Sequence, residues 1–354
     1  MKLTRSEFQN YIHSYEQDEI FYRDLYFAEK EHPETFMEYC QSLDREMIAQ
    51  RKLYVPALRK EGWLPYLNEG TLFQDFTGDI MLSKHYRYTP AFAHKHEFFE
   101  IMCIYDGTVK TTIQGIPHTL QQGDVCIIPP HTRHSVSIFD DSIAINILVR
   151  TSAFQSTFFQ TLTADSALSQ FFTHVLYHKT EGNFLIFHTG NDKIVMKSVE
   201  KLFIEYLGHE KYSYTFLNSM LILFWAKLLR YHENDIESIL TKETTGSSMT
   251  EILNYLNQNF QIASLSDTAA HFGYSSSHFS KLIKEGTGRT FLQIIRDIKL
   301  NQACRALRET TLSIPSICKL VGYETTEHFM RTFKKAYGMT PGEYRKTSSS
   351  LLEK

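Results

Sequence analysis

Apolar positions in the last hundred residues follow helical spacing, and the same pattern occurs twice, in residues 265–290 and again in 314–340. Each copy predicts a short helix, a turn at Gly273 or Gly322, and a second helix closed by another glycine. Glycine suits such a turn because it enters the left-handed backbone region without strain. This order of elements is typical of a helix-turn-helix unit, and two units could place two helices in successive major grooves of DNA.

The second helix of each copy is predicted to begin after a residue that caps helices well, Ser275 in the first copy and Thr325 in the second. Between the copies, residues 291–307 keep helical spacing without Pro or Gly. A helix of that length spans about 25 Å, which is the order of distance that separates two reading helices on DNA. The alternative is a helical-repeat array, but such arrays use shorter repeats and at least three of them.

A different pattern governs residues 71–150, where short apolar runs alternate with Gly and Pro. The run 99–105 ends at the hairpin signal Asp106-Gly107, and the run 143–149 is almost entirely apolar. Several short strands at this spacing predict a small β-sandwich or barrel.

Helical patterns flank this region. Residues 1–70 predict a helical extension, and residues 151–242 predict a helical connector or dimerisation segment, followed by a polar linker at 243–248. Within the connector, one apolar stripe is predicted to pack on the barrel or on a second subunit. Its members are Ile194, Val195, Val199, Leu202, Phe203, Tyr206 and Leu207.

Composition adds three points. The chain has 354 residues, which predicts two or three domains. Residues 247–346 hold 13 Lys and Arg against 8 Asp and Glu, a net charge of +5, while the rest of the chain has a net charge of −8. A local positive excess is what phosphate binding needs. The five cysteines stand singly, and neither a signal peptide nor a long apolar run is recognised, so we expect a cytoplasmic protein.

Residues 249–346 resemble the DNA-binding domain of the AraC/XylS family of bacterial transcription regulators. The resemblance is most specific in the closing stretch, from Phe333-Lys334-Lys335 through Gly338-Met339-Thr340-Pro341 to Tyr344-Arg345. It implies that the second helix of each unit contacts double-stranded DNA. The candidate DNA-binding residues are Ser276, Ser277, Ser280, Lys281, Lys284, Thr325, Thr326, Glu327, Met330, Arg331 and Lys334.

Residues 94–134 resemble the two motifs of a cupin domain. The first motif is matched at every defined position by His94, His96, Glu100 and Gly107. The second is matched by Gly123, Pro129 and His134, but it departs twice, because His131 replaces a glycine and Ile138 replaces an asparagine.

The histidines and glutamate leave two interpretations open. Three imidazoles and a carboxylate suit Mn, Fe, Ni or Zn by ligand type. Alternatively, they line the pocket of a small-molecule effector by hydrogen bonding. The resemblance implies sensing of a small organic molecule, so we expect neither a metal nor another cofactor. The candidate effector-binding residues are His94, His96, Glu100, Tyr105 and His134.

Aromatic residues on or beside the predicted strands would suit a sugar or another small polar effector. They are Phe76, Tyr86, Tyr88, Phe92, Phe98 and Tyr105. An ordinary aromatic core is the alternative, since 14% of the whole chain is aromatic.

Together these patterns predict a multidomain α+β protein with a small cupin-like β-barrel sensor, flanking helices and an all-α double helix-turn-helix domain. The predicted function is that of a transcription regulator, not an enzyme, that binds promoter half-sites as a homodimer, works with RNA polymerase and does not involve a membrane. One alternative is a metal-dependent cupin oxygenase or isomerase with a DNA-binding tail. Another is an architectural DNA-binding protein whose barrel is filled by side chains.

Overall fold

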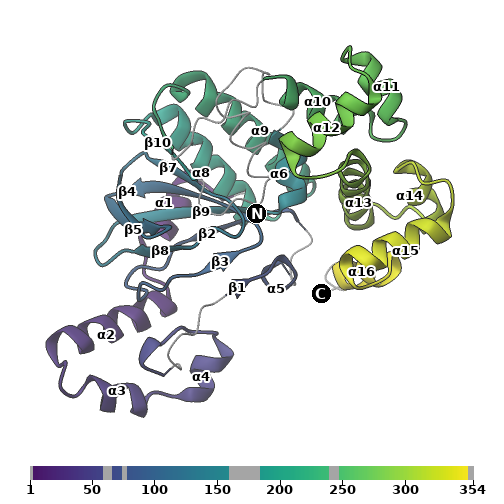
Figure 1. Cartoon of the computed structure of the whole chain (residues 1–354). Coiled ribbons are helices and arrows are strands. Elements are labelled where there is room, and N and C mark those ends of the chain that lie inside the picture. The colour runs from purple at the N-terminus through teal and green to yellow at the C-terminus, as the bar shows by residue number, and fades with distance from the viewer. Residues whose placement is uncertain (1–2, 59–65, 74–77, 159–183, 239–246, 350–354) are drawn as a thin grey trace. The chain divides into compact units, whose positions relative to one another are not determined.

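The computed structural model describes residues 3–58, 66–73, 78–158, 184–238 and 247–349 (Figure 1). The chain divides into two compact units. The first comprises Met1–Asn68, Ile80–Val149 and Glu181–Ile239, and the second comprises Glu69–Asp79, Arg150–Thr180 and Leu240–Lys354. Among the residues described, no helix combines the length and apolar character needed to cross a membrane.

Two antiparallel sheets form the centre of the first unit. The larger has the strand order β11-β10-β7-β4-β9-β2, and the smaller has the order β6-β5-β8. The strands are β2 (Ile80–Lys84), β4 (Phe99–Asp106), β5 (Thr108–Ile113), β6 (Ile116–Gln121), β7 (Val125–Ile128), β8 (His134–Ser137), β9 (Ile143–Val149), β10 (Leu185–Phe187) and β11 (Ile236–Ser238). Every residue of β9 is buried, which explains why this strand is almost entirely apolar. The short pair β1 (Tyr66–Leu67) and β3 (Lys95–His96) is parallel.

The predicted hairpin at Asp106-Gly107 joins β4 to β5. Gly107 has a φ of +73°. A Cβ atom there would lie 2.1 Å from Oγ of Ser142, so the turn requires glycine for its backbone conformation and for space.

Helices border the sheets of the first unit. They are α1 (Arg5–His13), α2 (Gln17–Glu31), α3 (Phe36–Ser42), α4 (Arg45–Gln50), the 3₁₀ turn η1 (Pro56–Leu58), α8 (Lys193–Gly208) and α9 (Ser213–His232). Most of the apolar stripe of α8 packs inside the unit, with Val195, Val199 and Leu202 fully buried, whereas Ile194 is 45% exposed. The segment 151–242 also contributes β10 and β11 to the large sheet, in addition to the helices that its pattern predicts.

A buried cluster of paired charges links α2 to the sheet. Nζ of Lys84 lies 2.6 Å from one carboxylate oxygen of Glu19, and Nε of Arg87 lies 2.9 Å from the other. The three side chains are at most 2% exposed. Because both oxygens of Glu19 are paired, its burial leaves no unsatisfied charge.

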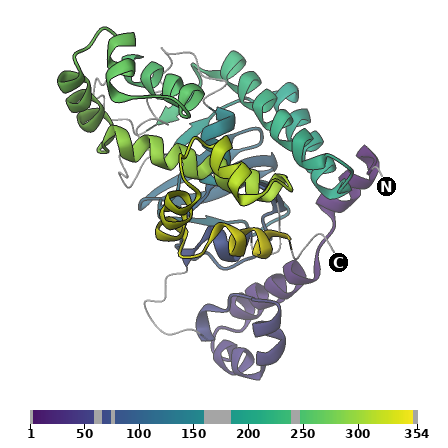
Figure 2. The ribbon, with the colours of Figure 1, turned by 90° about the vertical axis from the view of Figure 1, so that its right-hand side faces the viewer.

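The second unit contains the described helices from residue 247 onward and two short helices from earlier in the chain. They are α5 (Glu69–Leu72), α6 (Thr151–Phe158), α10 (Ser247–Asn259), α11 (Leu265–His271), α12 (Ser276–Thr287), α13 (Phe291–Glu309), α14 (Ile314–Leu320), α15 (Thr326–Tyr337) and α16 (Pro341–Ser349). Figure 2 shows the C-terminal helices from a second side. The pairs α11–α12 and α14–α15 are the two helix-turn-helix units, joined by the predicted continuous helix α13. The predicted fold class, an α+β protein with a sensor domain and an all-α reader, is confirmed by this architecture and by the family matches given below.

Buried ion pairs hold the short segment before β2 to the helices of the second unit. Arg308 of α13 donates to the Asp79 carboxylate and, 2.8 Å away, to the hydroxyl of Tyr344 in α16. Arg150 lies 3.6 Å from Asp79 and 3.7 Å from Glu69. Thus the residues directly preceding β2 and directly following β9 belong to the unit that carries the helix-turn-helix pairs.

Candidate functional site

The turns of the two helix-turn-helix units have matching backbone geometry. Gly273 and Gly322 have φ values of +73° and +72°. The side chains of Ser275 and Thr325 then cap α12 and α15, and each accepts a backbone hydrogen bond at 3.3 Å, from His278 and His328 respectively. The predicted turns and caps are therefore present in both units.

The candidate residues of α12 lie on one side of the helix, opposite the buried Phe279 and Ile283. Ser276, Ser277, Lys281 and Lys284 are exposed, and Ser280 is half-buried. Nζ of Lys281 lies 3.7 Å from Glu285 on the same exposed face.

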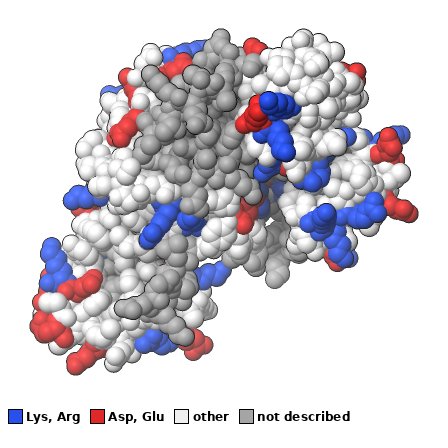
Figure 3. Space-filling view, viewed as in Figure 1, with Lys and Arg blue, Asp and Glu red and all other residues white. Residues whose placement is uncertain are grey.

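The candidate residues of α15 lie opposite the buried Phe329 and Phe333 in the same way. Thr325, Glu327, Met330, Arg331 and Lys334 are exposed, whereas Thr326 is half-buried. In Figure 3, basic side chains occur together with some acidic ones over the surface of the C-terminal helices.

Two features of this surface were not foreseen from the sequence. A groove of about 900 Å³ between α13 and α15 is lined by four basic side chains, Arg296, Lys299, Arg331 and Lys335, and by two acidic ones, Asp297 and Glu324. In addition, exposed His278 and His328 occupy equivalent positions, where each ring packs edge-on against the tyrosine of its turn at 5.2 and 5.4 Å. The repeated His-Phe pair in the two copies was a signal for this second feature.

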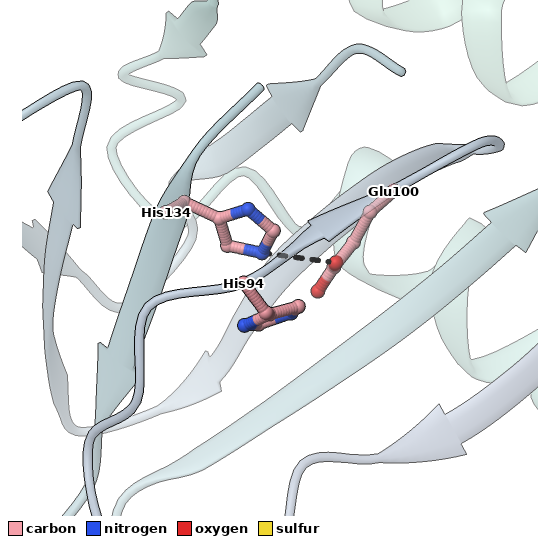
Figure 4. A group of neighbouring side chains, drawn as sticks. All are labelled: His94, Glu100 and His134. Atoms are coloured by element: carbon pink, nitrogen blue, oxygen red, sulfur yellow. Dashed lines mark ion pairs between the residues drawn. The ribbon is translucent and has the colours of Figure 1, made fainter. Parts of the chain in front are cut away.

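In the first unit, four of the five candidate effector residues come together. Glu100 lies on β4, His96 on β3, and His134 begins β8, where it forms a β-bridge with His94. Nε2 of His96 and Nε2 of His134 lie 3.2 and 3.3 Å from the same Glu100 oxygen, Oε2. Figure 4 shows His94 and His134 beside the Glu100 carboxylate.

The other ring nitrogen of each histidine faces a backbone carbonyl. Nδ1 of His96 lies 2.7 Å from the oxygen of Phe98, Nδ1 of His134 lies 3.2 Å from that of Thr132, and Nδ1 of His94 lies 3.3 Å from that of Phe92. Since a carbonyl accepts and cannot donate, these contacts favour a proton on Nδ1 of each ring.

Burial and neighbouring side chains together set the pKa values of the cluster. It lowers the pKa of His94 to about 3 and also lowers the pKa of His96, so both rings are neutral near pH 7. Burial opposes ionisation of Glu100, but the adjacent His134 and His96 outweigh it and hold the pKa of that carboxyl well below its usual range. The cluster therefore has a carboxylate beside the neutral rings of His94 and His96.

The first departure from the cupin motif leaves a glycine-like turn in place. His131 has a φ of +64°, a backbone conformation that favours glycine. Its backbone N–H donates to the oxygen of His96 at 2.7 Å, and Tyr66 lies parallel to its ring. At the second departure, Ile138 is buried in the apolar core instead of offering a polar side chain.

Tyr105 does not join the cluster. It lies five residues after Glu100 on β4, where the pairing with β9 is irregular between Ile104 and Asp106. Its hydroxyl donates to Glu200 at 2.8 Å, at a separate polar cavity of about 480 Å³ that Arg5, Lys193 and Lys197 also line.

The aromatic surroundings of the cluster are partly as expected. Phe98 stacks on His96, with ring centres 4.4 Å apart, and Phe92 lies 5.0 Å from His94. Phe76 lies outside the described residues. His85, which the sequence did not single out, is close enough for Glu100 and His134 to influence its pKa, which burial lowers.

Comparison with protein families gives two matches. Residues 81–181 match the AraC-like ligand binding domain, and residues 268–347 match a helix-turn-helix domain. Among curated proteins, the chain is 26% identical over 266 residues to the HTH-type transcriptional activator RhaS of Klebsiella pneumoniae (strain 342), covering 73% of this chain and 89% of the relative. RhaS of Escherichia coli O9:H4 (strain HS) is 24% identical over 262 residues, with the same coverage.

Solved structures with detectable similarity include ToxT of Vibrio cholerae and the C-terminal domain of AraT of Geobacillus stearothermophilus. ToxT, in a crystal structure with a bound unsaturated fatty acid, is 16% identical, with a TM-score of 0.35 over 78% of this chain and 98% of ToxT. The AraT domain is 29% identical, with a TM-score of 0.29 over 30% of this chain and 88% of the domain.

A ligand-binding domain joined to a double helix-turn-helix domain defines a DNA-binding transcription regulator that responds to an effector, as the sequence predicted. Both domains match in their expected places and the named relatives are transcriptional activators, so the chain has the domain organisation of an AraC-type transcription regulator.

Proposed function

We propose that this regulator recognises promoter half-sites by inserting α12 and α15 into the major groove. The support is that each helix buries one face and leaves its polar face exposed directly after a tight turn. The proposed contact residues are Ser276, Ser277, Ser280, Lys281, Lys284, Thr325, Thr326, Glu327, Met330, Arg331 and Lys334.

These residues have different roles in the proposal. Lys281 and Arg331 contact bases, because Arg or Lys to guanine is the commonest specific base contact. Lys284 and Lys334 lie almost one helical turn further along and contact phosphates, which positions the helices without reading sequence.

The effector site that we propose is the cluster of His94, His96, Glu100 and His134. Its buried polar atoms and adjacent aromatic rings suit a small polar molecule such as a sugar. Tyr105 faces the separate cavity described above, so we leave it out of this set.

The functional unit in this proposal is a homodimer, and α9 offers its contact surface. Phe216, Leu223 and Tyr231 are 56%, 58% and 48% exposed and recur at helical spacing on one face of α9. By contrast, Leu202 and Phe203 of α8 are buried within the subunit and do not offer such a surface.

The remaining parts of the proposal concern cellular context. The regulator acts in the cytoplasm together with RNA polymerase, and its barrel senses an effector without catalysing a reaction. This agrees with relatives that are named as transcriptional activators.

Selection of bound duplexes from a random pool by the full chain tests the DNA proposal. We expect enrichment of sites with two half-sites about one helical turn apart. The absence of any enriched sequence, with binding that depends only on salt, would sink the proposal of specific recognition.

Sedimentation of the full chain tests the dimer. Leu223→Asp on α9 should shift the protein towards monomer, whereas Ile116→Asp, an apolar-to-acidic change at an exposed position of β6, should leave the dimer intact. A dimer that survives Leu223→Asp would rule out α9 as the contact surface.

A further inference from the structure

The polar cavity beside Tyr105 lies within the first unit and shares no lining residue with the histidine cluster. Three parts of the chain form its walls, namely α1, the end of β4 with the turn between β6 and β7, and the first turns of α8. Its volume of about 480 Å³ falls within the range of small-molecule sites, which is about 300–1,000 Å³. The cavity is therefore large enough for a ligand of its own.

A hydrogen-bonded network around Glu200 joins these walls. Arg5 of α1 donates to both oxygens of the Glu200 carboxylate, at 2.9 and 3.0 Å, and the Tyr105 hydroxyl of β4 donates to it at 2.8 Å. Burial raises the pKa of Tyr105 to about 12, so this hydroxyl stays protonated and remains a donor. Because side chains of α1, β4 and α8 are bonded to one another, the cavity is organised before a ligand binds, which lowers the cost of binding.

The charges of the lining favour an anion. Apart from a histidine, three cationic side chains line the cavity against two acidic ones. The Glu200 carboxylate is already paired with Arg5. Lys193 and Lys197 lie four residues apart on the same face of α8, both are exposed, and neither forms an ion pair with another described residue. Only Asp106 then opposes these two lysines, so the cavity has an excess of positive charge.

Two amide side chains indicate what else the ligand contains. Nε2 of Gln9 donates to the Tyr105 hydroxyl, and Nε2 of Gln122 donates to the backbone oxygen of Tyr105 at 3.2 Å. Each amide nitrogen is thus bonded within the protein, whereas neither amide oxygen accepts a hydrogen bond from a residue in the described part of the chain. Since an amide oxygen accepts from hydroxyl groups, the lining suits a molecule with hydroxyl groups as well as negative charge.

We propose that the cavity between α1, β4 and α8 is a second ligand site of the sensor domain and binds a small polyhydroxylated anion, such as a sugar phosphate or a sugar acid. Lys193 and Lys197 bind the anionic group, and the amide oxygens of Gln9 and Gln122 accept hydrogen bonds from the hydroxyl groups of the ligand. The site is separate from the histidine cluster and does not depend on the effector role proposed there.

Titration calorimetry of the full chain with glucose 6-phosphate and, separately, with gluconate tests this site. We expect at least one of the two anions to bind saturably, with one molecule per chain, and the tighter of the two shows whether a phosphate or a carboxylate is preferred. Glucose has the hydroxyl groups without the charge, and inorganic phosphate has the charge without the hydroxyl groups. Each should bind about tenfold more weakly or less, because it makes only part of the hydrogen bonds.

Lysine variants locate the bound anion. The double substitution of Lys193→Gln and Lys197→Gln should lower the affinity for the anion about tenfold or more, because it removes the charged donors. The control carries Lys201→Gln and Lys211→Gln, which remove two exposed lysines from the end of α8 and the turn after it, outside the cavity. It has the same net charge as the first variant and should bind the anion as the unaltered chain does. Circular dichroism establishes that both variants are folded.

Three results would overturn the proposal. One is that the unaltered chain binds neither anion more tightly than it binds glucose. Another is that inorganic phosphate binds as tightly as the better of the two anions. The third is that the folded variant at Lys193 and Lys197 has the same affinity as its control, which would place the anion outside this cavity.

Discussion

The two helix-turn-helix units share a backbone plan but differ in what surrounds it. Both turn at a glycine with a φ near +72°, and both cap the next helix with a hydroxyl. A Cβ at Gly273 would meet nothing within 4 Å, whereas one at Gly322 would lie 2.8 Å from the carbonyl oxygen of Gln261. The first turn therefore needs glycine only for its backbone angle, and the second also needs it for close packing.

The outward faces differ in the same way. In α12, the exposed serines accompany Lys281, which has Glu285 for a neighbour at 3.7 Å. In α15, Arg331 lines a groove together with Lys335 and two cations of α13, Arg296 and Lys299. The two helix-turn-helix units therefore differ on their exposed faces, and the second unit should contribute more to recognition of DNA.

The largest expected difference concerns stability. Gly322→Ala should lower the free energy of unfolding by about 2–4 kcal/mol, from backbone strain and from the clash with Gln261. Gly273→Ala, the matched control, should cost about 1 kcal/mol from strain alone. Chemical unfolding of the two full-length variants measures this difference, and equal losses would contradict it.

A smaller effect concerns base recognition. Arg331→Ala should weaken binding to the selected site by about 1–3 kcal/mol and relax preference at one or two base pairs. Lys281→Ala should cost about 1 kcal/mol or less, since exposed Lys281 already has Glu285 nearby. Fluorescence anisotropy on specific and scrambled duplexes provides the measurement.

The control for this pair is Lys319→Ala, which removes an exposed positive charge from α14 and leaves both reading helices unchanged. It should not alter the ratio of specific to scrambled binding. If Arg331→Ala weakens both duplexes equally, Arg331 does not read bases.

The smallest effect should be the same in both units. Lys284→Ala and Lys334→Ala should each weaken all duplexes alike and reduce the slope of log affinity against log salt by about 1. Binding measured across a salt series tests this. A change in sequence preference in either variant would assign that lysine to bases instead of phosphates.

Local sequence patterns explain why the double helix-turn-helix domain could be predicted from the sequence. Gly273, Gly322, Ser275 and Thr325 act on their immediate neighbours, so the turns and caps follow from residue types alone. The groove between α13 and α15 could not be predicted in this way, because it depends on how distant helices pack. The three-residue strands β10 and β11 were missed because such short runs have no periodicity of their own.

In the sensor domain, too, some features could be predicted from the sequence and others depend on the folded chain. The first cupin motif predicted a shared site for His94, His96 and Glu100, although His96 lies on β3 and Glu100 on β4, so the three residues do not share one strand. Tyr105 lies where the pairing of β4 with β9 is irregular, so its separation from the cluster could not be predicted from spacing. The tautomers of the histidines depend on carbonyls whose position only the folded chain reveals.

The ion pair between Arg308 and Asp79 has a consequence for how such regulators can be recombined. A chimera cut at the linker would carry Arg308, whose side chain is 2% exposed, without the Asp79 carboxylate with which it pairs. A helix-turn-helix domain that is transferred to another protein should therefore include the stretch Glu69–Asp79. This stretch is encoded more than 150 codons upstream of the helices that it stabilises. Gene shuffling by a single crossover would break this module, and only exchange of both segments would carry it intact into a new host protein.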